Sequence, residues 1–185
     1  RCADYRPQMA TVRPGVMKLA EAQPGKQGEV EDFKVEFTPE DMNVTIKEVI
    51  KETKKAVDIT DAKVLVSGGR GIGSADFYKE LQKVADLLGG EISSSRANVD
   101  AGWIAKDRQV GQTGKTVRPD LYLACGISGA IQHIAGMENS ECVISINKND
   151  TAAIFDVSDL GIVGDVKVII PKLIDALTKY KAAQN

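Results

Sequence analysis

Four stretches rich in glycine, hydroxyl or guanidinium groups contain most of the residues that could do chemistry in this chain. They are Ser67–Gly71, Ser95–Arg96, Gln109–Gly114 and Gly126–His133. Each follows or adjoins a short apolar run that is typical of a sheet strand. Bare backbone N–H groups and small hydroxyls at one edge of a sheet are suited to bind the phosphate of a cofactor. The four stretches therefore predict a site for a phosphate-bearing cofactor.

The first of these stretches comes close to a dinucleotide-binding motif. Gly69–Ser74 fits G-x-G-x-x-G except that Ser74 replaces the third glycine. The acidic residue expected about twenty positions later is absent, and Ser94, Ser95 and Arg96 occupy that region. Such a motif alone is a weak signal, and a tight turn that needs positive φ explains its glycines equally well. Arg96 is either a solvated surface charge or a cation that binds a phosphate through two hydrogen bonds or lies beside a ring that gains negative charge on reduction.

The next stretches also allow two interpretations. In Gln109–Gly114, Gln112 and Thr113 either offer amide and hydroxyl groups to the heteroatoms of a ring or belong to an ordinary polar loop. After Gly126, the residues Ser128–Ala130 are predicted to open a helix. The free N–H groups of that helix would face an anion.

The single histidine, His133, would lie on that helix. A stripe of Ile127, Ile131 and Ile134 is predicted to face the sheet, and at about 100° per residue His133 falls well off this stripe. It is then either an exposed helix residue or a donor that stabilises a developing anion. One histidine and three widely spaced cysteines without a CxxC pair argue against a metal centre and a disulfide framework.

Alternating strands and helices must position these groups. The expected strands are Val64–Val66, a run from Ile92, Leu121–Cys125, Cys142–Ile146 and the shorter candidates Ala153–Phe155 and Gly161–Val163. The expected helices are Phe77–Leu88, stopped by two glycines, then about Ser128–Met137, and Val166–Ala183, interrupted by Pro171. The alternation predicts an α/β fold, a doubly wound, mostly parallel sheet with helices on both faces.

The region before this core has a different character. Arg1–Met17 predicts an extended arm, and Glu21–Asp32 an exposed linker. Phe33–Phe37 alternates apolar and polar residues and predicts a half-buried strand, while Thr38–Asp41 predicts a short helical turn. Val44–Thr53 fits either a strand or a helix.

The bulk composition is that of a globular protein. The chain has 185 residues, of which 43% are hydrophobic and 27% charged, as in an average soluble domain. A formal net charge of -2 offers no excess of cations and argues against nucleic acid as a partner. The apolar runs are too short to cross a bilayer and no secretion signal stands near residue 1, so we expect an intracellular protein without membrane insertion.

Taken together, the motifs resemble the alpha subunit of electron transfer flavoprotein, specifically its C-terminal FAD-binding domain. The blocks that carry the resemblance follow the family's order: Val64–Gly71, Ser95–Gly102, Gln109–Gly114, Gly126–Met137, Ile146–Lys148 and Gly161–Asp165. Residues Tyr5–Met17 resemble the stretch that closes the family's N-terminal domain. The resemblance implies that residues 1–20 are the tail of a missing N-terminal domain, 21–61 a linker and appendage, and 62–185 the FAD-binding domain.

The resemblance implies a Rossmann-like domain that binds FAD noncovalently across the carboxyl edge of the sheet. Ser128, Gly129 and Ala130 would hold the pyrophosphate. Arg96, Thr113 and His133 would surround the isoalloxazine ring and favour its singly reduced, anionic form. The implied contacts are Arg70, Ser95, Arg96, Val110, Gly111, Gln112, Thr113, Ser128, Gly129, Ala130, Ile131, Gln132, His133, Asn147, Asp165 and Val166, of which Asn147 and Asp165 would lie toward the adenosine.

The implied activity is that of an electron carrier rather than of an enzyme with its own substrate. FAD would accept electrons from an acyl-CoA dehydrogenase-type partner in fatty acid β-oxidation, with a beta subunit completing the heterodimer. The chain could also belong to an electron-bifurcating oxidoreductase complex. The expected location is the cytoplasm of a bacterium or the mitochondrial matrix of a eukaryote.

The residues themselves leave two other classes of protein open. In a nicotinamide-dependent dehydrogenase, the turn at Gly69–Ser74 would hold the pyrophosphate and Arg96 the 2′-phosphate of NADP. In a nonredox scaffold, the glycines would serve only tight turns.

Overall fold

The computed structural model describes residues 4, 6–12, 17, 20–41, 44–45, 47–48 and 57–183. The chain divides into two units, of which one is Lys18–Ala56 and the other joins Arg1–Met17 with Val57–Asn185. The sheet and the cavity described below belong to the second unit.

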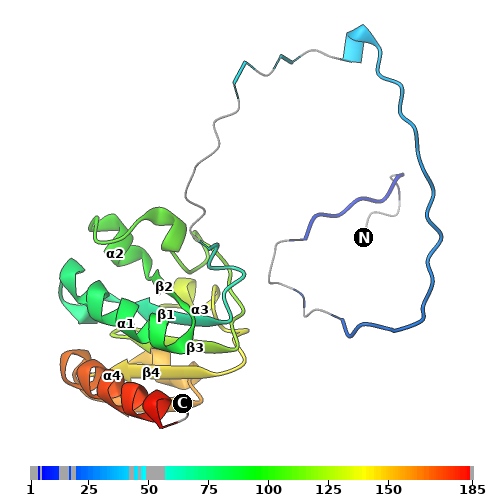
Figure 1. The fold of residues 1–185 in the computed structure, drawn as a ribbon. Helices are drawn as coiled ribbons and strands as arrows, with labels where there is room; N and C mark the ends of the chain where they lie inside the picture. The colour runs from blue at the N-terminus through cyan, green and yellow to red at the C-terminus, as the bar shows by residue number, and fades with distance from the viewer. Residues whose placement is uncertain are drawn as a thin grey trace. The chain divides into compact units, whose positions relative to one another are not determined.

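The sheet has five strands that all run parallel. They are β1 (Val64–Gly68), β2 (Glu91–Ser94), β3 (Leu121–Cys125), β4 (Val143–Asn147) and β5 (Leu160–Val163). Their order in the sheet is β2-β1-β3-β4-β5 (Figure 1). Strand β2 therefore lies on one side of β1, whereas β3, β4 and β5 follow one another on its other side. The strand order reverses between β1 and β3. In open α/β sheets, ligands bind beyond the carboxyl ends of the strands at such a point.

The register brings the carboxyl ends of the central strands level with one another. Gly68 at the end of β1 pairs with both Ser94 of β2 and Cys125 of β3. The loops that follow these strands consequently start side by side. The parallel α/β sheet predicted from the sequence is confirmed.

Helices α1 (Tyr78–Leu88) and α4 (Val166–Ala182) contact each other and cover one face of the sheet (Figure 1). Side chains from this face and from both helices form one apolar cluster, which includes Val66, Leu123, Leu81 and Ile170. Helix α1 ends where the sequence predicts, at Gly89, which adopts φ 67 and caps the helix. An amphipathic helix buried on its apolar side accounts for this packing.

Shorter elements cover the opposite face. They are α3 (Ile131–Ile134), the 3-10 helix η5 (Ala153–Val157) and the irregular segments around Val110 and Val117. Apolar side chains of η5 and of the irregular segments, with Ile127 and Met137 on either side of α3, form a second buried cluster with Leu65, Tyr122 and Val143 of the strands. Both faces are covered, as predicted, but this cover is mostly irregular.

The remaining short elements lie in the loops. They are α2 (Arg96–Asp100) and the 3-10 helices η1 (Pro39–Asp41), η2 (Arg70–Ile72), η3 (Ala75–Phe77) and η4 (Lys106–Arg108). Helix α2 was not predicted, because its five residues are too few to show a helical period.

The predicted helix over Ser128–Met137 is wrong in its start and its length. Helix α3 begins at Ile131, and Gly129 before it adopts φ 86, which is not helical. The predicted apolar stripe is also wrong, since Ile131 is 81% exposed and His133 is buried. A helix of four residues completes only one turn, so the helical period cannot be carried back to Ile127.

Two other predictions need correction. Ala153–Phe155, a strand candidate, lies in the 3-10 helix η5, because an apolar run this short does not distinguish strand from helix. Pro171 does not interrupt α4 but lies inside it, exposed and near its beginning. The missing N–H there removes one helical hydrogen bond.

The unit Lys18–Ala56 contains a further correction. Phe33–Phe37 is irregular rather than a half-buried strand, with Phe33 82% and Phe37 72% exposed. No strand among the described residues pairs with it, and a strand needs a partner for its backbone groups. Residues Glu21–Asp32 are exposed, as predicted, and most of Val44–Thr53 lies outside the described residues.

The predicted helical turn at Thr38–Asp41 is confirmed as η1. Both the backbone N–H and the hydroxyl of Thr38 donate to the Asp41 carboxylate, at 2.9 and 2.7 Å. These bonds lower the pKa of Asp41.

Among the described helices, none has the length and apolar character that crossing a membrane requires.

A glycine substitution tests the packing of the turns that follow β1 and β3. Gly126 has φ 65, and a Cβ placed on it would meet Gly71 Cα at 2.7 Å. Gly89 has nearly the same backbone, φ 67, but open space around its Cβ position. We expect Gly89→Ala to cost about 1 kcal/mol through backbone strain and Gly126→Ala about 3 kcal/mol, because the turns must also separate. Urea unfolding measures both, and equal losses would contradict this account.

Candidate functional site

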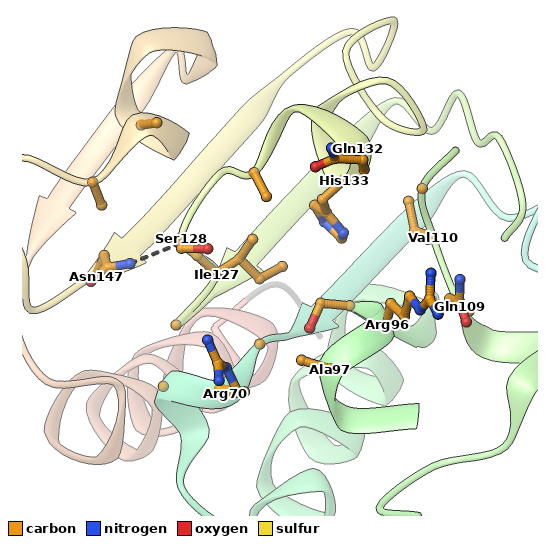
Figure 2. Close-up of a pocket in the computed structure, with 18 of the residues that line it drawn as sticks. Arg70, Arg96, Ala97, Gln109, Val110, Ile127, Ser128, Gln132, His133 and Asn147 are labelled. Atoms are coloured by element: carbon orange, nitrogen blue, oxygen red, sulfur yellow. Dashed lines mark hydrogen bonds between the residues drawn. The ribbon is translucent and has the colours of Figure 1, made fainter. Parts of the chain in front are cut away.

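A cavity of about 840 Å³ opens at the carboxyl ends of the central strands (Figure 2). Its wall is formed by the loops after β1, β2 and β3, by the end of β4, and by residues of α2, α3 and η5. The position matches the strand-order reversal between β1 and β3. Each of the four stretches singled out from the sequence contributes to this wall.

Backbone contact between two glycine turns forms one side of the cavity. The N–H of Gly69 donates to the carbonyl of Cys125 at 2.9 Å, and that of Gly71 to Gly126 at 3.0 Å. A side chain on Gly69 or Gly71 would fall on the backbone of Gly126. The motif glycines therefore serve this close approach, whatever else they bind.

Two arginines stand on the wall next to these turns. Arg70 lies in η2 and Arg96 opens α2 (Figure 2). The Nε of Arg96 is 3.2 Å from a carboxylate oxygen of Asp100, and both side chains are more than 60% exposed, at 65% and 62%. Exposed pairs of this kind contribute at most about 0.5 kcal/mol. Arg96 can therefore turn to a bound anion at little cost.

His133 projects from α3 into the cavity wall and is only 7% exposed (Figure 2). Its Nε2 lies 2.9 Å from the hydroxyl of Tyr122. Its Nδ1 is buried and has no hydrogen-bond partner among the described residues. Burial lowers the pKa of His133 to about 4, against the smaller opposing effect of the Val110 backbone. The imidazole is thus neutral at pH 7.

The loop Gln109–Gly114 is fixed at both ends of its turn. Val110 N–H donates to Ser94 O at 2.9 Å, and Gln112 N–H donates to Gln132 O at 2.7 Å. The amide of Gln109 donates to the Thr113 hydroxyl at 3.0 Å. Since that hydroxyl is already accepting, its own proton is free to point at a ligand.

The far end of the cavity is built from turns after β4. Asn147 donates from Nδ2 to Ile127 O at 2.8 Å and accepts from the N–H of Asn149 at 2.9 Å. The hydroxyl of Thr151 donates to Asn149 at 2.9 Å. These local bonds hold a polar edge that is typical of Asx and ST turns.

The structure gathers most of the predicted contact residues on one wall. Those that line the cavity are Arg70, Ser95, Arg96, Val110, Gly111, Thr113, Ser128, Ala130, Gln132, His133 and Asn147. Gln112, Gly129 and Ile131 lie beside lining residues in the same loops. Asp165 caps α4 by accepting from Lys167 N–H at 2.8 Å, and Val166 is buried in the core. That these five residues outside the wall contact the cofactor remains a prediction. The same holds for contact of the lining residues with a ligand.

Several lining residues were not among the predicted contacts. They are Gly69, Gly71, Ala97, Asp100, Gln109, Gly126, Ile127, Asn149, Thr151, Ala152 and Ala153. The three glycines belong to motifs already recognised, and the run Asn147–Thr151 has the asparagine and threonine spacing of consecutive turns. Ala97 and Asp100 lie in the block Ser95–Gly102 that carries the resemblance, but they belong to helix α2, which was not predicted.

The buried thiol of Cys125, beside the site, is unreactive at neutral pH. Cys125 is fully buried, and burial raises its pKa to about 12. A thiol in this state is not a nucleophile at neutral pH.

Among the described residues, no three histidine, cysteine or carboxylate groups lie together as a metal site would need.

Comparison with known proteins points to one family. Residues 58–138 match the family model described as the electron transfer flavoprotein FAD-binding domain. The electron transfer flavoprotein subunit alpha of Thermoanaerobacterium thermosaccharolyticum is 53% identical over 181 residues, which are 98% of this chain and 55% of that protein. For the Clostridium acetobutylicum subunit alpha, the identity is 52% over 100% of this chain and 54% of that protein.

A third relative has a different name. The acryloyl-CoA reductase electron transfer subunit beta of Anaerotignum propionicum is 48% identical over 98% of this chain and 51% of that protein. The chain spans about half the length of the curated relatives it matches.

The low pKa of His133 predicts a pH dependence of stability without ligand. The unfolded histidine binds its proton near pH 6.5, whereas the folded one does so only near pH 4. The free energy of unfolding should therefore fall as the pH drops from 6.5 toward 4, by roughly 3 kcal/mol in all. Urea unfolding between pH 7 and 5 measures the slope while most carboxylates stay charged.

His133→Asn is the comparison for this measurement. Because the variant has no histidine to titrate, its stability should be nearly constant over the same range, whatever its absolute value. The same slope in both proteins would mean that His133 is not the group responsible.

Proposed function

Because this chain belongs to the electron transfer flavoprotein alpha-subunit family, we propose that it holds FAD in the cavity described above and carries electrons between a dehydrogenase and a downstream acceptor. The family predicted from the sequence is confirmed, and the matching family model is that of an FAD-binding domain. The observation that carries the proposal is the convergence of Arg70, Arg96 and His133 on one cavity at the strand-order reversal.

The residues present fit FAD on three counts. The volume, about 840 Å³, lies in the range of cofactor sites. Gly69, Gly71 and Gly126 line the cavity with bare backbone, which a pyrophosphate can approach closely. The buried Nδ1 of His133 lacks a partner that a polar ring could supply.

We assign roles to these residues by their chemistry. Arg70 and the N–H groups near Ser128–Ala130 would bind the diphosphate, because guanidinium and free amides both favour anions. The polar edge of Asn147 and Asn149 would bind the adenosine end through hydrogen bonds. The assignment of Asp165 to the adenosine end, and of Val166 to the FAD contacts, is part of the same proposal.

Bound FAD supplies the one- and two-electron chemistry of its ring. The chain's own part is to orient that ring and to stabilise the negative charge that accompanies reduction. Arg96 would do so as a cation, Thr113 through its free hydroxyl proton and His133 through a ring N–H. Val110 and Ile127 would exclude water from its faces, which strengthens each of these electrostatic contacts.

The larger assembly is also a proposal. The relatives are called alpha subunits, and one is called an electron transfer subunit of acryloyl-CoA reductase. We infer a beta subunit that completes a heterodimer, an acyl-CoA dehydrogenase-type electron donor, and a role in fatty acid β-oxidation or in a bifurcating complex. The bacterial sources of these relatives favour the cytoplasm as the location.

Cofactor binding is the direct test of the proposal. The purified chain, alone and co-expressed with its beta subunit, should bind one FAD, seen as saturable quenching of flavin fluorescence. The released cofactor should be FAD and not FMN. Protection against thermal unfolding by NADP, with no effect of FAD, would instead support the dehydrogenase alternative. No response to either cofactor in both preparations would leave the scaffold alternative.

Arg96→Ala tests the electrostatic role of the first helical residue of α2. Loss of the cation should lower the potential of the first one-electron reduction by several tens of millivolts, since tenfold in equilibrium corresponds to about 59 mV for one electron. A spectroelectrochemical titration measures it. Lys172→Ala removes one exposed charge from α4, away from the cavity wall, and should leave the potential unchanged. Equal potentials in all three proteins would remove Arg96 from the ring site.

A further inference from the structure

A buried amide joins helix α2 to the sheet. Of the five described residues that form α2, Asn98 alone is buried. Its Nδ2 donates to the carbonyl of Gly68 at 3.2 Å and to the hydroxyl of Tyr78 at 2.9 Å. Gly68 is the last residue of β1, and Tyr78 is the first residue of α1. One side chain thus connects three elements of the fold.

The partners of this amide determine its orientation. The carbonyl of Gly68 can only accept hydrogen bonds, so the Asn98 atom that faces it must carry protons. An amide nitrogen has two N–H groups, and the two contacts use both of them. The Oδ1 atom is buried without a hydrogen-bond partner among the described residues, so it does not join the amide to any other segment.

The carbonyl of Gly68 also accepts from the residues that precede α2. The N–H of Ser95 donates to it at 3.0 Å. The hydroxyl of Ser94 lies 3.2 Å from the same oxygen and 2.5 Å from the hydroxyl of Tyr78. Ser94, Tyr78 and Asn98 are all buried, and hydrogen bonds are stronger where water is excluded. The first turn of α2 is therefore held at the end of β1.

The spacing of residues along α2 links this anchor to the cavity. Each residue of an α-helix is turned by about 100° from the one before it, so Arg96 and Asp100 each lie about 200° from Asn98. Arg96 and Asp100 line the cavity, and Asn98 is buried on the opposite side of the helix. Because α2 is little more than one turn long, its rotation depends on contacts with other elements.

The two ends of α2 are held by different contacts. Trp103, just after the helix, packs against the apolar cluster of α1 and α4. At the other end, Ser95 and Asn98 make the hydrogen bonds to β1. This second end carries Arg96, whose guanidinium is 65% exposed and pairs with Asp100 of the same helix. The place of Arg96 therefore depends on where the helix backbone lies.

We propose that Asn98 is a positioning residue that fixes the rotation of α2 and thereby keeps Arg96 on the cavity wall. Without this anchor the guanidinium would spend part of its time farther from the cavity, and its electrostatic effect on a bound ring would decrease with that distance. The effect on the ring rests on the proposed FAD function. The anchoring of α2 is a property of the protein without cofactor.

Amide hydrogen exchange of the protein without FAD tests the anchor. The N–H groups of Ser95 and Ala101 report on α2, because they donate to Gly68 O at 3.0 Å and to Ala97 O at 3.2 Å. In Asn98→Ala, both should exchange about tenfold faster relative to the amides of α4, since local opening becomes easier. Equal relative rates in the variant and the unsubstituted protein would contradict the anchor.

Val84→Ala is the matched control for this measurement. Val84 is fully buried on α1, in the same apolar cluster as Tyr78, and its truncation removes no hydrogen bond from α2. The relative exchange rates of Ser95 and Ala101 should therefore stay unchanged. If Asn98→Ala does not fold, Tyr78→Phe removes one acceptor of the amide and should also speed exchange at α2. No change in Tyr78→Phe would equally contradict the anchor.

The reduction of bound FAD tests the positioning role, with the chain co-expressed with its beta subunit. Asn98→Ala should lower the equilibrium constant of the first one-electron reduction about threefold, less than Arg96→Ala does, because the cation is displaced but not removed. In the Arg96→Ala protein, the same substitution should have almost no further effect. A decrease of equal size in both proteins would mean that Asn98 does not act through Arg96.

The two measurements separate this proposal from the proposed function. If FAD binds but exchange at α2 does not depend on Asn98, the positioning role fails and the function stands. If no FAD binds while exchange at α2 depends on Asn98, the function fails and the anchor stands.

Discussion

The close backbone contact between the turns after β1 and β3 is the constraint on which the site depends. Gly69 and Gly71 donate to Cys125 and Gly126, and a side chain on Gly69, Gly71 or Gly126 would collide with the backbone of the opposite turn. This contact brings η2, the start of the β3 loop and the mouth of the cavity into one rigid corner. Parallel pairing of β1 with β3 aligns the turns, and the glycines let them meet. The positions of Arg70 and Ile127 follow from the same corner.

Much of this was predictable from the sequence, since the signals are local. The limits of β3 were found from its apolar run, and Gly89 marked the end of α1 as a C-cap glycine should. The motif glycines, Arg96 and Thr113 were expected near one cofactor and do share a cavity. Motifs that follow parallel strands can be placed in this way, because the carboxyl ends of such strands meet at one edge.

What was missed depends on packing between distant segments. The burial of His133 arises because Gly129 breaks the helical phase and α3 is a single turn. Its partner Tyr122 is 11 residues earlier on a strand, and no periodicity links the two. Phe33–Phe37 has the alternation of a strand but no pairing partner among the described residues. Alternation with a period of two concerns the side chains, whereas a strand also requires a second backbone segment with which to form hydrogen bonds.

The strand order also determines how the cavity can come into existence. Val64 pairs with Leu121, so the central pair of the sheet closes a loop that contains α1, β2 and α2. Pairings between residues so distant along the chain are slow to form, because loop entropy is lost before contacts compensate for it. The corner between the two glycine turns can arise only with that pairing. Cofactor capture is consequently a late event in folding, and a nascent chain released before Asn147 has emerged lacks β4 and one wall of its cavity.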